Sequence, residues 1–194
     1  MAAARSTHKI DDFWAIPEDD RFHELIGGVI TRKASPSGEH ADAQAALLAA
    51  LRGSFHRSAG GIDKPGGWWV LLEVEILLDG EIARPDVLGW RRDRCPSRPT
   101  GTPVKQRPDW VCEVLSPSNA SRDTVEKLRL YHRSGIPHYW IIDPDDATLT
   151  VMRWSSGGYS NVLAAEHGDR VRAEPFQQIE LAVGTLFGDE PMDL

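Results

Sequence analysis

Two acidic residues, Asp86 and Glu113, are the strongest indication of chemistry in this sequence. Asp86 follows Arg84-Pro85 at the start of the apolar stretch DVLGW, and Glu113 interrupts the apolar stretch WVCEVL. An ionised carboxylate in such a stretch is costly unless a cation, a metal or a hydrogen-bond network compensates it. If the two stretches are neighbouring strands, both carboxylates meet at one point. There they can hold a hard divalent cation such as Mg²⁺, with water and phosphate oxygens as further ligands.

Lys127 is the third candidate for this site. It lies 14 residues after Glu113, about one strand end and one helical turn further along the chain. Its long side chain can reach back over the sheet edge towards the two acids. An ammonium there would help to orient a metal-bound water and stabilise charge on a phosphate. A structural interpretation also stays open, because Asp123, four residues earlier, would form an ordinary exposed ion pair with Lys127.

The elements that must position these residues are predicted from turn residues and apolar spacing. Gly27-Gly28 predict a tight hairpin over 22–34. Helices are predicted over 40–57 and over 121–135, the second with Ser121 as its N-cap and Gly135 at its end. Strands are predicted over 68–78, 83–90, 110–115, 136–146, 148–154 and 158–164, with a turn at Asp79-Gly80 and a Ser-Pro-Ser-Asn turn over 116–119.

Composition limits the protein class. The 194 residues are 41% hydrophobic, which suits one globular domain over residues 1–194. No apolar run approaches the ~20 residues that a membrane helix needs, and the N-terminal residues lack the apolar core of a secretory signal. We therefore expect a cytoplasmic protein with no membrane partner. Cys95 and Cys112 suggest neither a disulfide framework nor a zinc site.

The distribution of charged residues bears on whether the protein binds nucleic acid. A formal charge of −7 argues against tight, nonspecific nucleic-acid binding, because affinity for phosphate comes largely from Lys and Arg. The segment 84–107 is nevertheless basic and could face phosphates, or it could be an ordinary solvated loop. Its candidates for nucleic-acid contact are Arg91, Arg92, Arg94 and Arg98. Trp68-Trp69 would help to form a dimer interface if exposed, or would be buried in the sheet.

Four further polar residues are candidates for the same site. Glu24 in FHELIGG could ligate a metal or orient another group, and it could equally be a solvated acid of the hairpin. Glu73 could approach Asp86 from a neighbouring strand, although Glu73 and Glu75 on one face usually indicate a wet face. His40 and Gln44 are one helical turn apart and could face the same cleft, although His40 could equally be a residue at the start of the helix with a satisfied hydrogen bond.

A longer set of residues resembles a known family. Pro-Asp at the start of a strand, a buried Glu in the next strand and then Lys is similar to the core of PD-(D/E)XK nucleases. More narrowly, RPDVLGW followed by DWVCEVLSPSNASRDTVEKLRLYHRSGIPHYWIIDP resembles the bacterial Uma-type restriction-endonuclease-like family, long labelled a domain of unknown function. The matching residues are Pro85-Asp86, Glu113 to Ser118, Asp123, Lys127, Tyr131 and Gly135 to Trp140. The likeness extends upstream to HELIGGVI and SPSGEHADAQAAL, and so covers most of the chain.

The resemblance implies a fold and a site. The fold is α/β, a restriction-endonuclease-like αβββαβ core with a mixed central sheet, an N-terminal hairpin and a C-terminal strand extension. Asp86, Glu113 and the carbonyl of Val114 would be metal ligands for Mg²⁺, with Mn²⁺ as a substitute, and Lys127 would be the catalytic lysine. The superfamily lysine normally stands two residues after the buried Glu, where this sequence has Leu115. The implied substrate is DNA, and a homodimer would supply two cutting sites.

Two other functions remain to be distinguished from an endonuclease. One is a catalytically inactive nuclease-fold module that binds DNA or protein, which Leu115 and the acidic net charge favour. The other is a glycosidase that uses the two carboxylates as acid and base. No aromatic sugar platform is evident for it, and Lys127 would have no clear role.

Overall fold

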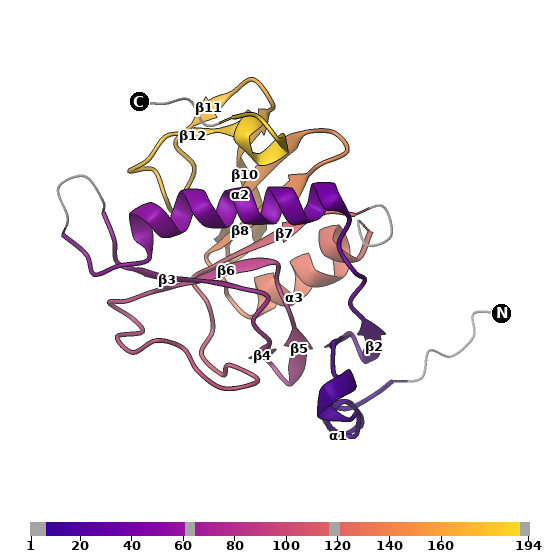
Figure 1. Cartoon of the computed structure of the whole chain (residues 1–194). Coiled ribbons are helices and arrows are strands. Elements are labelled where there is room, and N and C mark those ends of the chain that lie inside the picture. The colour runs from indigo at the N-terminus through magenta and orange to yellow at the C-terminus, as the bar shows by residue number, and fades with distance from the viewer. Residues whose placement is uncertain (1–6, 61–64, 117–120, 191–194) are drawn as a thin grey trace.

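A six-stranded mixed sheet forms the centre of the computed structural model, which describes residues 7–60, 65–116 and 121–190 (Figure 1). The strand order in this sheet is β10-β9-β8-β7-β6-β3. Its strands are β3 (Trp68–Leu72), β6 (Val87–Arg91), β7 (Trp110–Val114), β8 (His138–Asp143), β9 (Thr148–Ser155) and β10 (Gly158–Glu166). Only the β7–β8 pair is parallel among these neighbours; the other pairs are antiparallel.

Two helical segments cover opposite faces of this sheet. Helix α2 (Gly38–Phe55) lies in front of the central sheet in Figure 1, and it shares a core cluster with Trp110, Cys112 and Val114 of β7. The second segment consists of a π-helix, η2 (Arg122–Lys127), that continues into α3 (Leu128–Arg133). It packs with Val111 on the other face. Alternation along β7 therefore sends successive side chains to different helices, and Glu113 belongs to the α3 face.

The order of the elements confirms the predicted core. Along the chain, α2, β3, β6, β7, α3 and β8 form the αβββαβ unit, and the helical segment between β7 and β8 makes the crossover that a parallel pair requires. The N-terminal hairpin and the C-terminal strands are also present. Strands β11 (Arg170–Val171) and β12 (Leu181–Ala182) pair in the extension, which ends with the 3-10 helix η3 (Val183–Phe187).

A second sheet of four short strands holds the N-terminal hairpin. Its order is β2-β1-β5-β4, and its strands are β1 (His23–Ile26), β2 (Val29–Arg32), β4 (Ile76–Leu78) and β5 (Glu81–Ala83). The hairpin turn at Gly27-Gly28 is confirmed, with both residues at positive φ. Two short helices precede this hairpin, α1 (Ile10–Trp14) and η1 (Glu18–Asp20).

Two predicted strands are each divided between the sheets. The predicted strand 68–78 becomes β3 and β4, because Glu73 adopts φ 48, a left-handed conformation that interrupts strand geometry. The predicted strand 83–90 divides at Arg84-Pro85-Asp86 into β5 and β6. The inserted β4–β5 hairpin thus belongs to the four-stranded sheet, and its turn at Asp79-Gly80 is confirmed.

The structure also tests the predictions for Ser121, Gly135 and the Trp68-Trp69 pair. Ser121 is not an N-cap, because its backbone is already helical and its side chain makes no capping hydrogen bond. Gly135 does end the helix, with φ 67. Trp68 is buried, and Trp69 is half-buried with Arg92 stacked over its ring, so this pair forms part of the sheet rather than an open interface.

Two predictions concern segments rather than single residues. Most of the predicted Ser-Pro-Ser-Asn turn, residues 117–119, lies outside the described residues. Within the described ranges, no helix has the length and apolar character needed to cross a membrane.

Phe176 closes the core on the α2 face. It is 1% exposed, and its ring lies 4.8 Å from Phe55, 4.9 Å from Trp68 and 5.0 Å from Trp110, measured between centroids. Such aromatic clusters dominate the stability of a core because each ring buries a large apolar area. Phe176 thereby joins the C-terminal extension to the central sheet.

We predict that Phe176→Ala lowers the free energy of unfolding by about 3–5 kcal/mol, the usual effect of removing a buried ring. Urea denaturation followed by tryptophan fluorescence measures it. Val162→Ala on the exposed face of β10 is the control, with a change below about 0.5 kcal/mol. Equal stabilities of the two variants would show that the extension does not support the core.

Candidate active site

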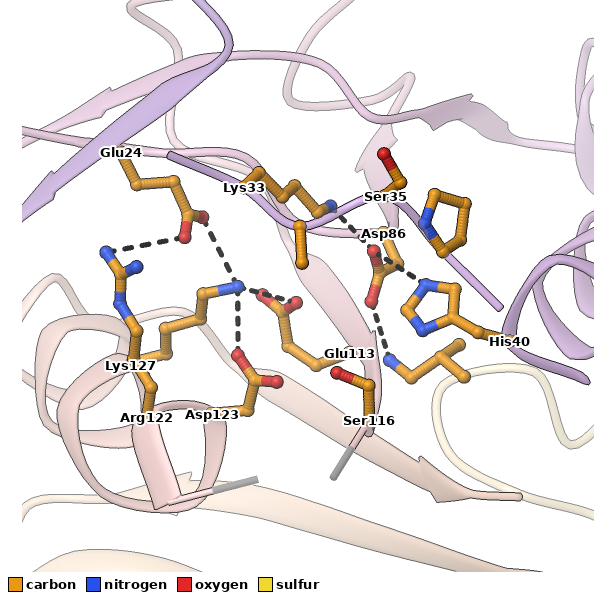
Figure 2. A pocket seen from close by; sticks show the side chains of 13 residues that line it. Glu24, Lys33, Ser35, His40, Asp86, Glu113, Ser116, Arg122, Asp123 and Lys127 are labelled. Atoms are coloured by element: carbon orange, nitrogen blue, oxygen red, sulfur yellow. Dashed lines mark hydrogen bonds and ion pairs between the residues drawn. The ribbon is translucent and has the colours of Figure 1, made fainter. Parts of the chain in front are cut away.

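The candidate site is a polar pocket at the end of the central sheet, where the hairpin, α2 and η2 meet (Figure 2). It contains both acids and the lysine singled out from the sequence. The residues that line it are Glu24, Lys33, Ala34, Ser35, Pro36, His40, Asp86, Glu113, Val114, Ser116, Arg122, Asp123 and Lys127.

Strand register places Asp86 and Glu113 side by side. Val87 pairs with Cys112 in the antiparallel β6–β7 ladder, so Asp86, just before β6, lies opposite Glu113. The backbone N–H of Val114 donates to Asp86 Oδ2 at 2.7 Å. The predicted neighbourhood of the two acids is therefore confirmed, and both side chains are almost completely buried.

Lys127 reaches this pair of acids from η2. Its Nζ lies 2.8 Å from Glu113 Oε2, 3.0 Å from Asp123 Oδ1 and 3.2 Å from Glu24 Oε1. The lysine side chain is only 4% exposed. The alternative of an ordinary exposed ion pair with Asp123 is therefore wrong, because this ammonium is buried among three carboxylates.

Tyr131 supports Glu113 from the next turn of the helix. Its hydroxyl donates to Glu113 Oε1 at 2.5 Å, while Lys127 contacts the other carboxylate oxygen. Tyr131 and Tyr139 are both buried, as predicted for core residues. The Tyr139 hydroxyl donates to the backbone carbonyl of Asp123 at 2.9 Å. The two tyrosines thus orient residues on both sides of Lys127.

Asp86 has its own set of partners. Its Oδ1 lies 2.6 Å from Lys33 Nζ and 3.3 Å from His40 Nε2, and Gln44 donates to its backbone carbonyl at 3.0 Å. Serine 37 caps α2 by accepting from the backbone N–H of His40, which fixes the start of this helix beside the pocket. His40 and Gln44 therefore do face the site.

Glu24 is buried within the site rather than solvated. It accepts from the backbone N–H of Arg84 at 2.9 Å, and the guanidinium of Arg122 lies 3.5 Å from its Oε2. Glu73 lies behind Asp86: its backbone N–H donates to the carbonyl of Asp86, and its carboxylate accepts from Gln44.

The strand pattern suggested that Glu73 and Glu75 share a solvent-exposed face, but Glu75 does not lie on such a face. It is buried and paired with Arg84 at 3.0 Å. The left-handed backbone at Glu73 explains this difference, because it changes the direction of the chain between the two acids.

The mutual contacts shift the pKa values in this pocket. Burial alone would lower the pKa of Lys127, but Glu113, Glu24 and Asp123 outweigh burial and raise it well above its usual value. Burial would raise the pKa of Asp86, but the hydrogen bond from His40 and the charge of Lys33 lower it strongly. Lys127 is therefore held protonated and Asp86 ionised at neutral pH.

The donor set fits a hard divalent cation. Asp86, Glu113 and the carbonyl of Val114 offer only oxygen ligands, which Mg²⁺ prefers. Among the described residues, no three His, Cys, Asp or Glu side chains are arranged to hold a metal ion by themselves. Such a site would therefore depend on the main chain and on water or substrate oxygens, as magnesium sites with one or two carboxylates commonly do.

The four arginines predicted to contact nucleic acid lie elsewhere. Arg91 ends β6, whereas Asp86 precedes its start, about 17 Å away at the usual rise along a strand. Arg91 pairs with Asp93, Arg92 donates to the carbonyl of Trp68, and Arg94 pairs with Asp109. None of the four, Arg98 included, lines the described pocket.

Four residues of the site, Lys33, Arg122, Asp123 and Tyr131, were not predicted from the sequence as site residues. The sequence identifies Asp123 only as a matching residue of the family and as an exposed partner of Lys127. Lys33 directly follows a half-exposed strand and begins the loop that leads to α2, a position where most lysines are solvated. Arg122 precedes the matched Asp123 and offers no pattern of its own. Tyr131 is part of the family motif, but its spacing on the helix indicates only a core position.

We predict that Lys127→Met lowers the free energy of unfolding by about 3–5 kcal/mol at pH 7, because it leaves buried carboxylates unpaired. The loss should shrink as the pH falls towards about 4.5. Without the ammonium, the folded-state pKa values of these acids rise, so the penalty is greatest at high pH and protonation relieves it. Thermal or urea unfolding at both pH values measures this. Lys105→Met, at an exposed position, is the control with the same charge change.

Comparison with known proteins agrees with this architecture. Residues 10–184 match the family model Uma2, described as "Putative restriction endonuclease". The fold is similar to a crystal structure titled as that of "a putative nuclease belonging to DUF820 from Anabaena variabilis ATCC 29413". The TM-score is 0.75 at 22% identity, over 92% of this chain and 97% of that chain. A comparison with curated proteins gives no match.

The family match covers almost the whole chain and includes the motif residues that line the pocket. The structural similarity independently supports a restriction-endonuclease-like fold. Because the model matches residues 10–184, this chain belongs to the Uma2 family of restriction-endonuclease-like proteins.

Proposed function

We propose that this chain is a Mg²⁺-dependent endonuclease that hydrolyses phosphodiester bonds of DNA. The observation that carries the proposal is the juxtaposition of Asp86, just before β6, and Glu113 of the adjacent strand β7, with the ammonium of Lys127 at 2.8 Å from Glu113. The family description and the name of the structural neighbour support a nuclease. DNA as the substrate comes from that family membership.

The two acids and a main-chain carbonyl would hold the cation. Asp86 offers Oδ1, since its Oδ2 accepts from the backbone of Val114, and Glu113 is oriented by Tyr131. Bound Mg²⁺ would supply Lewis-acid stabilisation of the phosphate and of an attacking water. Glu24 and Asp123 each contact the ammonium of Lys127. They would position this lysine rather than bind the cation.

Lys127 would act as a fixed positive charge. A lysine that takes a proton in catalysis needs a pKa near the working pH, whereas the three carboxylates raise the pKa of Lys127 well above its usual value. Its role is therefore to stabilise negative charge on the scissile phosphate and to orient the attacking water. Removing a preorganised donor of this kind typically lowers kcat about 10²–10³-fold.

The residues that line the pocket also bear on the two alternative functions, a glycosidase and an inactive binding module. A glycosidase site would need an apolar or aromatic platform for a sugar, but no Trp, Tyr or Phe is among the described residues that line this pocket. An inactive module that binds DNA or protein remains the second candidate, because Lys33 and Lys127 already neutralise the two proposed ligands. Cleavage in the presence and absence of metal distinguishes this module from an enzyme.

Location and assembly are part of the proposal. A nuclease that acts on DNA in a bacterium would work in the cytoplasm. A homodimer would bring two sites to a duplex and allow both strands to be cut.

We expect Mg²⁺ or Mn²⁺ to support cleavage of plasmid or single-stranded DNA, and EDTA to abolish it. Asp86→Asn, Glu113→Gln and Lys127→Ala should each lower the rate by at least about 10²-fold, because each removes a ligand or the fixed charge. Gel assays with purified variants measure the rate. Asp145→Asn, an exposed acid outside the pocket, is the matched control.

The stability of every variant must be measured alongside the rate, since Lys127 is also structural. A folded wild type that binds Mn²⁺ but cuts neither substrate would contradict the enzyme and favour the inactive module. Cleavage that persists in EDTA would contradict the metal-dependent mechanism.

The predicted arginine contacts can be tested by salt dependence. Replacing Arg91, Arg92, Arg94 and Arg98 with Gln should weaken DNA binding by the same factor for all sequences. Each lost phosphate contact should also reduce the slope of log affinity against log salt by about 1. The separation of about 17 Å between Arg91 and Asp86 corresponds to about five base pairs of duplex, so a contact from Arg91 would flank the cleaved bond. Fluorescence anisotropy with Ca²⁺ gives both quantities, and an unchanged slope would exclude the contacts.

A further inference from the structure

Lys33 is a second buried ammonium in the pocket, and neither the family motif nor the proposed mechanism uses it. It directly follows β2, and its side chain is 8% exposed. Its Nζ lies 2.6 Å from Asp86 Oδ1 and 2.9 Å from the carbonyl of Arg84, with Glu73 Oε1 at 3.8 Å. Figure 2 shows its ammonium directed at Asp86. Lys33 thus occupies a cluster of hard oxygen atoms.

The two oxygens of Asp86 are not equivalent. Oδ2 accepts the buried hydrogen bond from the backbone of Val114 at 2.7 Å, so strand pairing holds it in place. Oδ1 carries the contacts to Lys33 and His40. A divalent cation bound through Asp86 would therefore use Oδ1, at the 2.0–2.1 Å or so that Mg²⁺ requires. An ammonium and a divalent cation on one buried oxygen would repel each other strongly.

Lys33 and Lys127 differ in how firmly they are held. Lys127 lies within 3.2 Å of three carboxylates, so it keeps two partners if Glu113 turns towards a metal. Lys33 has one close carboxylate partner, since Glu73 is 3.8 Å away. Lys33 is also attached by a flexible stem at the wall of the pocket. Lys33 is therefore the ammonium that can leave.

We propose that Lys33 is a built-in competitor of the divalent cation: it neutralises Asp86 and must leave Oδ1 when the cation binds there. Its charge sets the metal concentration at which the site fills. The proposal rests on the proposed function only in taking Asp86 as a metal ligand. It does not require the chain to cut DNA.

Titration of metal-depleted protein with Mn²⁺, by calorimetry and without DNA, tests the proposal. We expect Lys33→Met to bind Mn²⁺ at least about ten-fold more tightly than the wild type, because it removes a contacting charge of the same sign. Lys33→Arg keeps the charge and should show no gain. Lys105→Met, exposed and outside the pocket, should stay within about two-fold of the wild type. Asp86→Asn combined with Lys33→Met should lose the gain.

Several results would overturn the proposal. Equal or weaker Mn²⁺ binding by folded Lys33→Met would do so, as would an equal gain in Lys105→Met or a gain that survives Asp86→Asn. Failure of both the wild type and Lys33→Met to bind Mn²⁺ would overturn it together with the metal site. Tighter Mn²⁺ binding without any DNA cleavage would leave this proposal standing and contradict the endonuclease alone.

A measurement on the wild type covers the case in which Lys33→Met does not fold. Acetylation of lysines by a water-soluble reagent, followed by peptide mass spectrometry, compares the protein with and without Mg²⁺. Release from Asp86 should raise the acetylation rate of Lys33 at least about five-fold, because a solvated amine reacts faster than one buried in an ion pair. Lys105 is the exposed reference. A rate for Lys33 that Mg²⁺ leaves unchanged would contradict displacement.

Discussion

The burial of four carboxylates in one pocket is the constraint on which the rest of the site depends. Glu24, Asp86, Glu113 and Asp123 are each no more than 3% exposed. Unpaired charges at that depth would unfold a domain of ordinary stability. Each acid therefore has a cation within 3.3 Å, and Lys127 alone serves three of them. The compensation is shared across the pocket, so no single ion pair can be removed without affecting its neighbours.

This shared compensation connects parts of the chain that are distant in sequence. Lys33 follows the hairpin of the four-stranded sheet, and Lys127 comes from η2. Glu113 belongs to the central sheet, and Asp86 directly precedes its strand β6. The backbone N–H of Arg84, in the link that leads from β5 to β6 of the central sheet, donates to Glu24 of β1. The position of the hairpin is thus tied to the ionised state of the pocket, in addition to its small apolar core around Phe13, Leu25 and Ile82. The contacts that stabilise the fold here are therefore also the contacts that form the candidate site.

Some features of this site can be predicted from the sequence and others cannot, for physical reasons. An acid within an apolar strand has few explanations, so Asp86 and Glu113 were identifiable without a structure. The division of strand 68–78 was not, because WWVLLEVEILL contains no Gly, Pro, Asn, Asp or Ser to mark a break, and the left-handed backbone of Glu73 is rare for a residue other than glycine. Lys33 has no local signal at all. Its role follows from the neighbouring oxygen atoms, which only the folded chain brings to it.

The origin of Lys127 on a helix explains its chemistry. Leu115 occupies the strand position two residues after Glu113, so the ammonium beside that acid comes instead from η2. A long flexible side chain can place its charge in the same space from either backbone. The helical route, however, also brings Asp123 from the preceding turn and places the ammonium against Glu24. These added carboxylates keep Lys127 protonated. In the proposed mechanism, a lysine so placed would supply charge rather than transfer a proton, and the attacking water would lose its proton to another acceptor.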